Sequence, residues 1–209
     1  MLNHEFRDQA QKKGYQNIAG IDEAGRGPLA GPVVAAAAIL SDKFILDGIN
    51  DSKKLSPKKR EALYEQIIAS DEVTFGIGIV PPSRIDEINI LQATFMAMSL
   101  AVNQLSIVAD LLLIDGNQSP KLAIPDVTVV KGDSKELSIA VASILAKVTR
   151  DRIMIDLDEK YPHYGFAKHM GYPTKAHIEA LTLHGVSPVH RLSFGPVKKL
   201  AQMASAFST

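Results

Sequence analysis

Five short apolar runs give the chain its first structural signal. They cover residues 18–21, 33–40, 73–80, 111–114 and 127–130, and each is followed within two residues by a charged residue or a proline. Runs of this length, bounded by turn-forming or charged residues, are typical of buried strands. The sequence therefore predicts five strands within the first 130 residues.

Longer stretches between and after these runs have helical spacing. Ser56 and Pro57 form an N-cap followed by a first-turn proline, which predicts a helix with Leu63 and Ile67 on one face. Residues 90–105, a long segment after residue 133, and residues 175–184 are also predicted helices. In the first two, apolar positions recur at spacings of three, four or seven, at Leu91, Phe95, Met98 and Val102, then at Leu137, Val141, Ile144, Val148 and Ile155.

This order of elements predicts the α/β class, with a mixed β-sheet flanked by helices. We expect the sheet and its helices to form a core over residues 1–158. Residues 159–209 are richer in Tyr, His, Gly and Pro, and we expect them to form a C-terminal helical subdomain and tail that belong to the same functional unit.

Composition narrows the possible classes of protein. Hydrophobic residues make up 46% of the 209 residues and charged residues 22%, which is close to a globular average. There is no cysteine, which excludes disulfides and thiolate metal sites. The N-terminal segment has no apolar signal-peptide core, and no apolar run is long enough to span a bilayer. We therefore expect a cytoplasmic protein without membrane contact.

Formal net charge is zero, although nucleic-acid-binding proteins are usually basic. Basic residues nevertheless concentrate in one stretch, residues 51–60, at Lys53, Lys54, Lys58, Lys59 and Arg60. Such a patch can follow a phosphate backbone even on a neutral protein. Taken alone, this stretch is more typical of the solvated start of a helix.

Carboxylates follow three of the predicted strands. Asp22 and Glu23 follow the first, Asp115 ends the fourth, and Asp133 comes just after the fifth. Strand ends are where α/β sheets build sites, and clustered carboxylates repel unless a cation lies between them. Hard oxygen ligands without cysteine suit Mg²⁺ or Mn²⁺, and two such ions can activate a water and stabilise the leaving oxygen of a phosphodiester.

Each carboxylate also has a structural interpretation. Asp115 with Gly116 is an ordinary turn pair, and Asp133 with Glu136 fits a capping box, with Asp133 as N-cap and Glu136 at the third helical position. The adjacent Asp22 and Glu23 are harder to explain this way because they interrupt a strand edge beside glycines. From the residues alone, a metal site and a set of turns and caps both remain open.

A glycine-rich segment follows the first strand, with Gly25, Arg26, Gly27 and Gly31 in the pattern G-x-G-x-x-x-G. This is also a loose dinucleotide-binding fingerprint, which would indicate an oxidoreductase. Two neighbouring carboxylates would repel a pyrophosphate, and Pro32 with the next apolar run favours a second strand over a helix. The glycines can instead bring bare backbone against a nucleic acid, with Arg26 gripping a phosphate, or form a tight loop with an exposed arginine.

The sequence resembles the ribonuclease HII family of bacteria in six segments that keep the family's order. The segment IAGIDEAGRGPLAGPV at 18–33 resembles the family's N-terminal signature and is highly specific. The others are DSKKLSPKKR at 51–60, LLIDG at 112–116, KGDSKELSIAVASILAKVTRDR at 131–152, YPHYGFAKHMGYPTKAHIEAL at 161–181 and HGVSPVHRLSF at 184–194. The resemblance implies a ribonuclease H-like fold.

The resemblance also implies roles for individual residues. It places the family's four metal-binding carboxylates at Asp22, Glu23, Asp115 and Asp133. It implies that Gly25, Arg26 and Gly27 contact the ribose 2′-hydroxyl and backbone at the cleaved junction, and that Tyr172 stacks on the neighbouring deoxyribose. Other positions would bind the strand or support the site, namely Lys53 and, with less support, Arg191 and Ser193.

Two further features bear on the resemblance. Asp133 favours ribonuclease HII over the related HIII enzymes, which have Glu there, as does the short segment before the first strand. Glu136 departs from the small or neutral residue expected at its position and could perturb a second metal site. His184 and His190 are interpreted as structural.

The implied reaction is two-metal hydrolysis of RNA in RNA/DNA hybrids, and of single ribonucleotides in duplex DNA, with Mg²⁺ or Mn²⁺. Cleavage 5′ of the ribonucleotide would leave a 3′-hydroxyl and a 5′-phosphate, in DNA repair and replication. Two alternatives remain open, namely a dinucleotide-dependent oxidoreductase and a hybrid-binding protein without catalysis. We expect a monomer. Residues 202–207 faintly resemble a sliding-clamp-binding peptide that lacks its central leucine, so we expect a disordered end with at most weak clamp contact.

Overall fold

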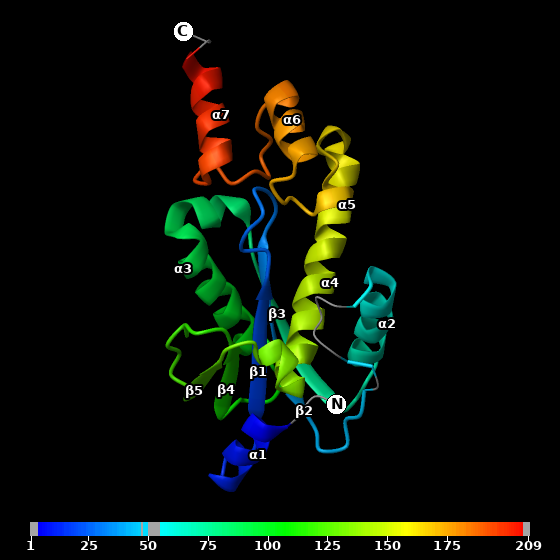
Figure 1. Cartoon of the computed structure of the whole chain (residues 1–209). Coiled ribbons are helices and arrows are strands. Elements are labelled where there is room, and N and C mark those ends of the chain that lie inside the picture. The colour runs from blue at the N-terminus through cyan, green and yellow to red at the C-terminus, as the bar shows by residue number, and fades with distance from the viewer. Residues whose placement is uncertain (1–3, 47, 50–54, 207–209) are drawn as a thin grey trace. The chain divides into compact units, whose positions relative to one another are not determined.

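The computed structural model describes residues 4–46, 48, 49 and 55–206 (Figure 1), with side chains described as far as residue 203. The strands are β1 (Ile18–Ala24), β2 (Val33–Leu40), β3 (Val73–Val80), β4 (Leu111–Asp115) and β5 (Asp126–Val129). The α-helices are α1 (Glu5–Lys12), α2 (Pro57–Ile68), α3 (Pro82–Asn103), α4 (Leu137–Lys160), α5 (Phe166–His169), α6 (Lys175–His184) and α7 (Gly195–Ala206). Two 3₁₀ turns are η2 (Gly132–Ser134) and η3 (Pro162–Tyr164).

The strands form one mixed sheet in the order β3-β2-β1-β4-β5. Strand β1 pairs antiparallel with β2 and parallel with β4, and β4 pairs parallel with β5. Strand β2 is buried along its whole length, which explains its alanine-rich, non-alternating sequence. The predicted α/β class and all five predicted strands are confirmed.

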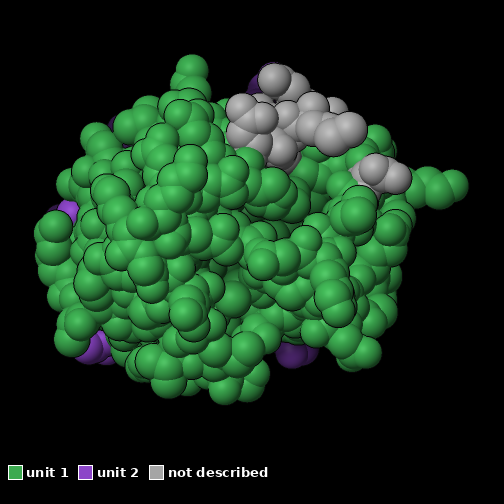
Figure 2. All heavy atoms as spheres, turned by 90° about the horizontal axis from the view of Figure 1, so that it is seen from below, with its two compact units in different colours: residues 1–24, 34–79, 95–148 green, residues 25–33, 80–94, 149–209 purple. Residues whose placement is uncertain are grey.

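The chain divides into two compact units, coloured separately in Figure 2. Unit 1 comprises residues 1–24, 34–79 and 95–148, and it contains nearly all of the sheet. Unit 2 comprises residues 25–33, 80–94 and 149–209. Its core gathers Leu29 and Ala30 from the glycine-rich segment with Met154 of α4, Phe166 of α5 and Leu181 of α6.

Helix α4 packs directly on β1 because of a single glycine. A Cβ atom at Gly20 would lie 2.2 Å from the Ser138 carbonyl carbon and 2.4 Å from the Ile139 nitrogen. No side chain can occupy that space, so only glycine lets the two backbones approach this closely. This approach fixes the first turns of α4 against β1, two residues before Asp22.

Helix α3 begins earlier than the periodicity of its sequence predicted. It starts at Pro82 and is kinked at Asn89, which has a φ of 67°. The Asn89 Oδ1 accepts hydrogen bonds from the backbone N–H groups of Leu91 and Gln92, at 3.0 and 3.1 Å. Asn89 therefore caps a second helical segment, and that segment is the helix predicted over residues 90–105.

By length and composition α3 could cross a membrane, contrary to the expectation that no segment could. Its packing is that of a core helix. Cβ atoms at Gly76 and Gly78 of β3 would lie 2.2 and 2.0 Å from the carbonyl oxygens of Ala101 and Ala97, so helix and strand are in direct contact. This contact with β3 accounts for the small apolar residues on that face of α3.

Three helices of the described residues were not predicted from the sequence. Helix α1 precedes the first strand, the short α5 lies between α4 and α6, and α7 includes residues for which we expected a disordered end. Val197 of α7 is fully buried in the unit 2 core, with Leu200 packed against it. The expectation of disorder is therefore wrong as far as residue 206, while Phe207 lies outside the described residues.

Candidate active site

Asp22 and Asp115 come from the two central parallel strands of the sheet. The register of β1 with β4 runs from Ile18 beside Leu111 to Ile21 beside Ile114, and the two aspartates are the next residues of each strand. Asp22 was predicted to follow β1 but lies within it, because β1 stays paired with β2 as far as Ala24. The register therefore brings the two carboxylates together at one end of the β1–β4 pair.

Asp22 belongs to a cluster of three carboxylates whose charges interact. Its side chain is only 4% exposed. Burial, and then the neighbouring Glu23 and Asp115 carboxylates, raise the pKa of Asp22 well above its ordinary value. Hydrogen bonds from Ser143 on α4 and from the Glu23 backbone N–H, at 2.7 Å, oppose that rise without cancelling it. A cation beside these three carboxylates would relieve the repulsion.

Asp133 lies in the turn η2, next to a residue that contacts this cluster. The backbone N–H of its neighbour Gly132 donates a 2.6 Å hydrogen bond to the Asp115 carboxylate. Asp133 itself is 4% exposed. The capping box is wrong, because α4 begins at Leu137 and Asp133 belongs to the separate 3₁₀ turn. The structural interpretation of Asp133 as the N-cap of the long helix is therefore removed.

Glu136 binds the backbone of helix α1. Its carboxylate is fully buried and accepts a 3.2 Å hydrogen bond from the Arg7 backbone N–H, in the first turn of α1. Burial raises the pKa of Glu136, while hydrogen bonds from the Arg7, Ser138 and Phe6 backbone lower it. Glu136 thus contributes to the docking of α1, a structural role that the sequence did not predict.

The chemistry of the four carboxylates fits a divalent cation, although their side chains are not already arranged as a coordination site. Within the described part of the chain, no group of three His, Asp or Glu side chains is arranged to hold a metal ion. Asp22, Glu23 and Asp115 are close enough for their charges to interact, and Asp115 is linked to the turn that carries Asp133. An oxygen-only donor set with several negative charges close together suits a hard divalent cation.

The glycine-rich segment belongs to unit 2, where a buried arginine donates hydrogen bonds to several backbone carbonyls of the segment. Arg191 is 0% exposed. Its guanidinium donates hydrogen bonds to the carbonyl oxygens of Gly25 at 2.6 Å, Arg26 at 3.1 Å, Gly31 at 2.9 Å and Pro32 at 3.1 Å. Arg191 therefore supports the loop from within. Its burial leaves no direct role in strand binding.

Arg150 of α4 completes this support. It donates to the carbonyl oxygens of Pro32 at 3.0 Å, Ala30 at 3.1 Å and Met170 at 3.0 Å. Burial lowers the pKa of Arg150 to about 10 and that of Arg191 to about 9, so both remain protonated at neutral pH. Sequence reasoning missed Arg150, because its acceptors are far away along the chain.

Tyr172 lies beside the glycine-rich segment. Its side chain is 45% exposed. A Cβ atom at Gly27 would lie 3.6 Å from the Tyr172 Cε1, and the Leu29 N–H donates to the Gly171 carbonyl over 2.8 Å. Gly27 of the Gly-Arg-Gly motif and Tyr172 therefore lie side by side in unit 2, and their role toward a substrate stays a prediction. The segment leads into β2 and opens no helix, so the dinucleotide-binding interpretation is wrong.

The basic stretch is only partly described. Lys53 and Lys54 lie outside the described residues. Lys58 and Lys59 are exposed on α2, whose predicted cap is confirmed by a 3.3 Å hydrogen bond from the Lys59 N–H to the Ser56 hydroxyl. Arg60 is 8% exposed and donates to the Leu55 carbonyl, so it supports the local fold. Ser193 also has a local role, since its hydroxyl donates to Asp86 over 2.6 Å.

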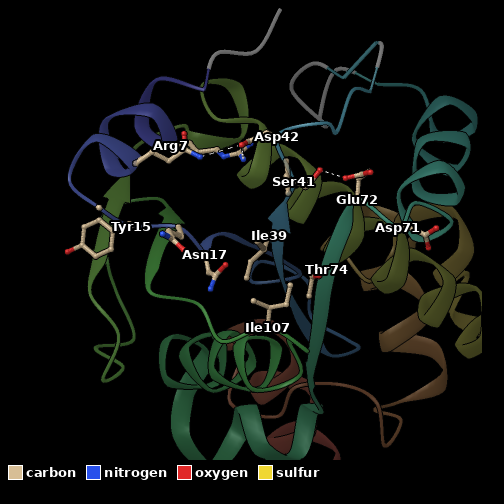
Figure 3. Close-up of a pocket in the computed structure, with 14 residues that line it drawn as sticks. Arg7, Tyr15, Asn17, Ile39, Ser41, Asp42, Asp71, Glu72, Thr74 and Ile107 are labelled. Carbon is tan, nitrogen blue, oxygen red and sulfur yellow. Dashed lines mark hydrogen bonds and ion pairs between the residues drawn. The ribbon is translucent and has the colours of Figure 1, made fainter.

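A pocket of about 660 Å³ in unit 1 is lined by other residues (Figure 3). Arg7 forms an ion pair with Asp42, and the Ser41 hydroxyl donates to Glu72. The four candidate carboxylates do not line it. This pocket is therefore separate from the candidate active site.

Solved structures define the class to which this fold belongs. The ribonuclease H2 from Pyrococcus horikoshii OT3 is 30% identical, with a TM-score of 0.74 over 90% of this chain and 98% of that one. Ribonuclease HII of Archaeoglobus fulgidus, in its complex with PCNA, is 28% identical, with a TM-score of 0.67 over 86% and 96%. Bst-RNase HIII, solved with Mn²⁺, is 19% identical with a TM-score of 0.69 over 94% and 73%, and shares the fold. This protein is a nuclease of the ribonuclease H class.

Sequence comparisons narrow the class to one family. The family model described as Ribonuclease HII matches residues 19–197. Ribonuclease HII of a Bacillus cereus strain is 55% identical over 197 residues, which are 94% of this chain and 76% of that protein. Ribonuclease HII of Magnetococcus marinus is 56% identical over 191 residues, or 90% and 89%. The chain belongs to the ribonuclease HII family, which hydrolyses the RNA of RNA/DNA hybrids.

Proposed function

We propose that this protein is an endoribonuclease that cuts both RNA/DNA hybrids and single ribonucleotides embedded in duplex DNA. Cleavage falls on the 5′ side of the ribonucleotide and leaves a 3′-hydroxyl and a 5′-phosphate. The observation that carries the proposal is the buried Asp22, repelled by Glu23 and Asp115, in a chain of the ribonuclease HII family. In a cell, this activity would remove misincorporated ribonucleotides and RNA primers.

Asp22, Glu23, Asp115 and Asp133 would hold one or two divalent cations, Mg²⁺ or Mn²⁺. Bound there, the cations supply Lewis-acid activation of water and neutralisation of the departing oxygen. The carboxylates contribute negative charge and position. The Ser143 and Gly132 hydrogen bonds to Asp22 and Asp115 restrict how those carboxylates can turn. Since no three of the described side chains form a ready-made set, we propose that cation binding itself completes the site.

Gly25, Arg26, Gly27 and Tyr172 would read the sugar. A ribonucleotide differs from a deoxyribonucleotide at the 2′-hydroxyl, which can donate and accept a hydrogen bond. Bare backbone at the two glycines can approach that hydroxyl, while the exposed Tyr172 ring offers a flat face to the neighbouring deoxyribose. Arg26 adds a charge for the phosphate. Lys53 and Lys58 would contact the backbone further along the duplex.

The test uses three labelled duplexes: DNA with one ribonucleotide, a uniform RNA/DNA hybrid and all-DNA. We expect the first two to be cut in Mg²⁺ or Mn²⁺, neither to be cut in EDTA, and the all-DNA duplex to survive throughout. Asp22→Asn removes cleavage, while Asp71→Asn, which changes an exposed aspartate of unit 1, retains it. Binding of the hybrid without metal-dependent cleavage would make the protein a hybrid-binding module and overturn the proposal.

A clamp contact is a smaller proposal. The Archaeoglobus fulgidus relative forms a complex with PCNA. The region of this chain that faintly resembles a clamp-binding peptide, residues 202–207, begins within helix α7. Deleting residues 202–209 and measuring binding to a bacterial sliding clamp tests the contact, and equal binding of the shortened chain would remove it.

A further inference from the structure

Unit 2 contains a chain of hydrogen-bonded histidines that begins at the backbone of Tyr172. The Tyr172 carbonyl oxygen lies 2.9 Å from His177 Nδ1, and His177 Nε2 lies 3.0 Å from His190 Nε2. His190 Nδ1 then lies 3.1 Å from the Ser187 backbone nitrogen and 2.7 Å from the Ser187 hydroxyl. His177 and His190 are 0% and 2% exposed, so water does not compete for these bonds.

The position of every proton in this series of hydrogen-bonded histidines follows from one backbone group. The Ser187 N–H can only donate, so His190 Nδ1 is an unprotonated acceptor. A neutral His190 ring then carries its proton on Nε2 and donates it to His177 Nε2. His177 therefore carries its own proton on Nδ1, where it is donated to the Tyr172 carbonyl. The chain is complete only when both rings are neutral.

His169 holds the other side of the same peptide unit. Its Nδ1 accepts from the Gly171 N–H at 3.2 Å, so its proton is on Nε2, which lies 2.8 Å from the Tyr164 carbonyl oxygen. The His169 ring stacks on His177 with centroids 4.4 Å apart. The Tyr172 N–H also donates to the His169 carbonyl over 2.9 Å. Neutral imidazoles thus bracket the backbone that carries the Tyr172 ring.

We infer that His169, His177 and His190 are positioning residues for Tyr172, which hold its ring for sugar recognition only in their neutral, single-tautomer state. The inference rests on the proposed function of Tyr172 at a ribonucleotide junction. A second proton on His190 would direct Nδ1–H against the Ser187 N–H, and one on His177 would set two Nε2–H groups against each other. Either event breaks the chain and releases the segment around Tyr172.

The surroundings of the pair keep it neutral. Burial, and then the charge that His177 would carry, lower the pKa of His190 to about 4. Burial is also the main cause that lowers the pKa of His177, with the charge of His169 acting in the same direction. Among the described residues, the titratable side chains that pack against His190 also include Tyr164, whose ring centroid is 4.8 Å away. Junction reading should therefore persist at neutral pH and fail in acid.

Histidine nitrogen NMR on the unmodified protein tests the inference without any cleavage assay. We expect His177 as the Nδ1–H tautomer and His169 and His190 as the Nε2–H tautomers at pH 7, with His190 unprotonated until about pH 4. The opposite tautomer at His177 or His190, or a His190 midpoint at the ordinary value of 6.5, would overturn it. This result holds or fails whether or not the protein cuts RNA.

A series of substitutions tests whether the hydrogen-bonded histidines contribute to recognition of the ribonucleotide junction. His177→Phe removes the donor to Tyr172 but keeps a ring to stack on His169, while His177→Asn keeps an N–H donor near the Nδ1 position. For His177→Phe we expect kcat/KM on the single-ribonucleotide duplex to fall at least tenfold further than on the uniform hybrid, and His177→Asn to recover part of that gap. His184→Phe, on an exposed histidine that stacks on His163, is the matched control and changes neither substrate.

Equal losses on the two duplexes, or no gap between His177→Phe and the control, would reduce the histidines to general support of the fold and overturn the inference. Should the parent protein cut neither duplex, the proposed function fails by itself. The tautomers then still decide whether the histidine chain exists. The two failures are therefore distinguishable.

Discussion

Arg191 donates a 2.6 Å hydrogen bond to the carbonyl oxygen of Gly25, and both groups are buried. A residue 166 positions away along the chain thereby fixes the backbone of the proposed sugar-reading loop. The loop carbonyls face inward to a planar cation that satisfies several of them together. In the proposed function, Arg26 and the neighbouring glycines would act toward the substrate.

Arg191→Lys should show how much of the loop depends on this geometry. Lysine keeps the charge but cannot reach the same carbonyls with one ammonium group, and each buried carbonyl left without a donor costs about 1–3 kcal/mol. We expect a loss of about 3 kcal/mol in the free energy of unfolding and lower kcat/KM on both the hybrid and the junction. Arg84→Lys, on a partly exposed arginine paired with Glu87, is the control and should change stability by less than about 0.5 kcal/mol. If Arg191→Lys had the same stability and activity as the parent, the hydrogen bonds to these carbonyls would contribute little to either.

Asp22→Asn should stabilise the metal-free protein while removing activity. Folding raises the pKa of Asp22 above its ordinary value of 3.8. The protein therefore loses stability as the pH rises from 3.8 through the pKa of the folded state, and this loss persists at higher pH. Asparagine carries no charge and avoids that cost, with a gain in Tm of about 2–4 °C for each kcal/mol relieved. Thermal unfolding in EDTA at neutral pH measures the gain, which should vanish below pH 3.8. Saturating Mn²⁺ should raise the Tm of the parent more than that of Asp22→Asn.

Asp133→Asn separates a metal ligand from a structural turn residue. Because Asp133 lies in η2 and does not cap α4, asparagine should leave the helix and the hybrid affinity nearly intact. We expect cleavage to fall by at least 100-fold, since a ligand charge is lost. Gel assays on the hybrid, with fold checked by circular dichroism, measure this. Cleavage at close to the parent rate would exclude Asp133 from the metal site.

The stability of the protein should fall in mild acid because of the buried histidines. The pKa of His190 drops from 6.5 to about 4 on folding, so between these values the unfolded chain binds a proton that the folded protein excludes. Stability is complete above pH 6.5 and falls by up to about 1.4 kcal/mol per pH unit as pH decreases toward 4. Urea unfolding at several pH values should show a flatter profile for His190→Gln than for the parent, and an unchanged one for His184→Gln. Parallel profiles for parent and His190→Gln would contradict a depressed His190 pKa.

Local sequence signals predicted the sheet and its acidic residues well. The predicted bounds of β2, β3 and α6 match the structure, because apolar runs, prolines and a capping threonine mark them locally. The register of β1 with β4 then brought two predicted carboxylates to neighbouring positions. These features depend on residues close together in the chain, or on regular strand pairing, and so they could be read in advance.

The supporting residues could not be predicted in the same way. In the sequence, Arg150 is simply a charged residue on a long predicted helix. In the structure it donates to the carbonyl oxygens of Pro32 and Ala30, which lie 118 and 120 residues earlier. Glu136 reads as part of a capping box, yet its carboxylate holds the Arg7 backbone, 129 residues away. Burial of a charged side chain depends on carbonyl groups brought in by the tertiary fold, and a sequence pattern carries no signal for them.

The two glycines of the Gly-Arg-Gly motif should respond oppositely to alanine. Gly25 has a φ of +97°, and a Cβ there would lie 2.1 Å from Arg150 Nε and 2.8 Å from the Pro32 carbonyl oxygen. Gly27 is free of both problems, since its Cβ would make ordinary contact with the Tyr172 ring at 3.6 Å. Gly25→Ala should therefore destabilise the protein by several kcal/mol, whereas Gly27→Ala should match the parent or gain up to about 1 kcal/mol.

Cleavage should fall for Gly27→Ala despite its intact fold, because the added methyl group occupies space that the proposed function reserves for the ribose. We expect at least a tenfold loss in kcat/KM on both the hybrid and the single-ribonucleotide duplex, while urea unfolding shows a stability equal to or slightly above that of the parent. The comparison isolates the substrate-facing glycine from the fold-supporting one. Full activity in Gly27→Ala would mean that no sugar approaches this backbone, and the 2′-hydroxyl would then have to be read elsewhere.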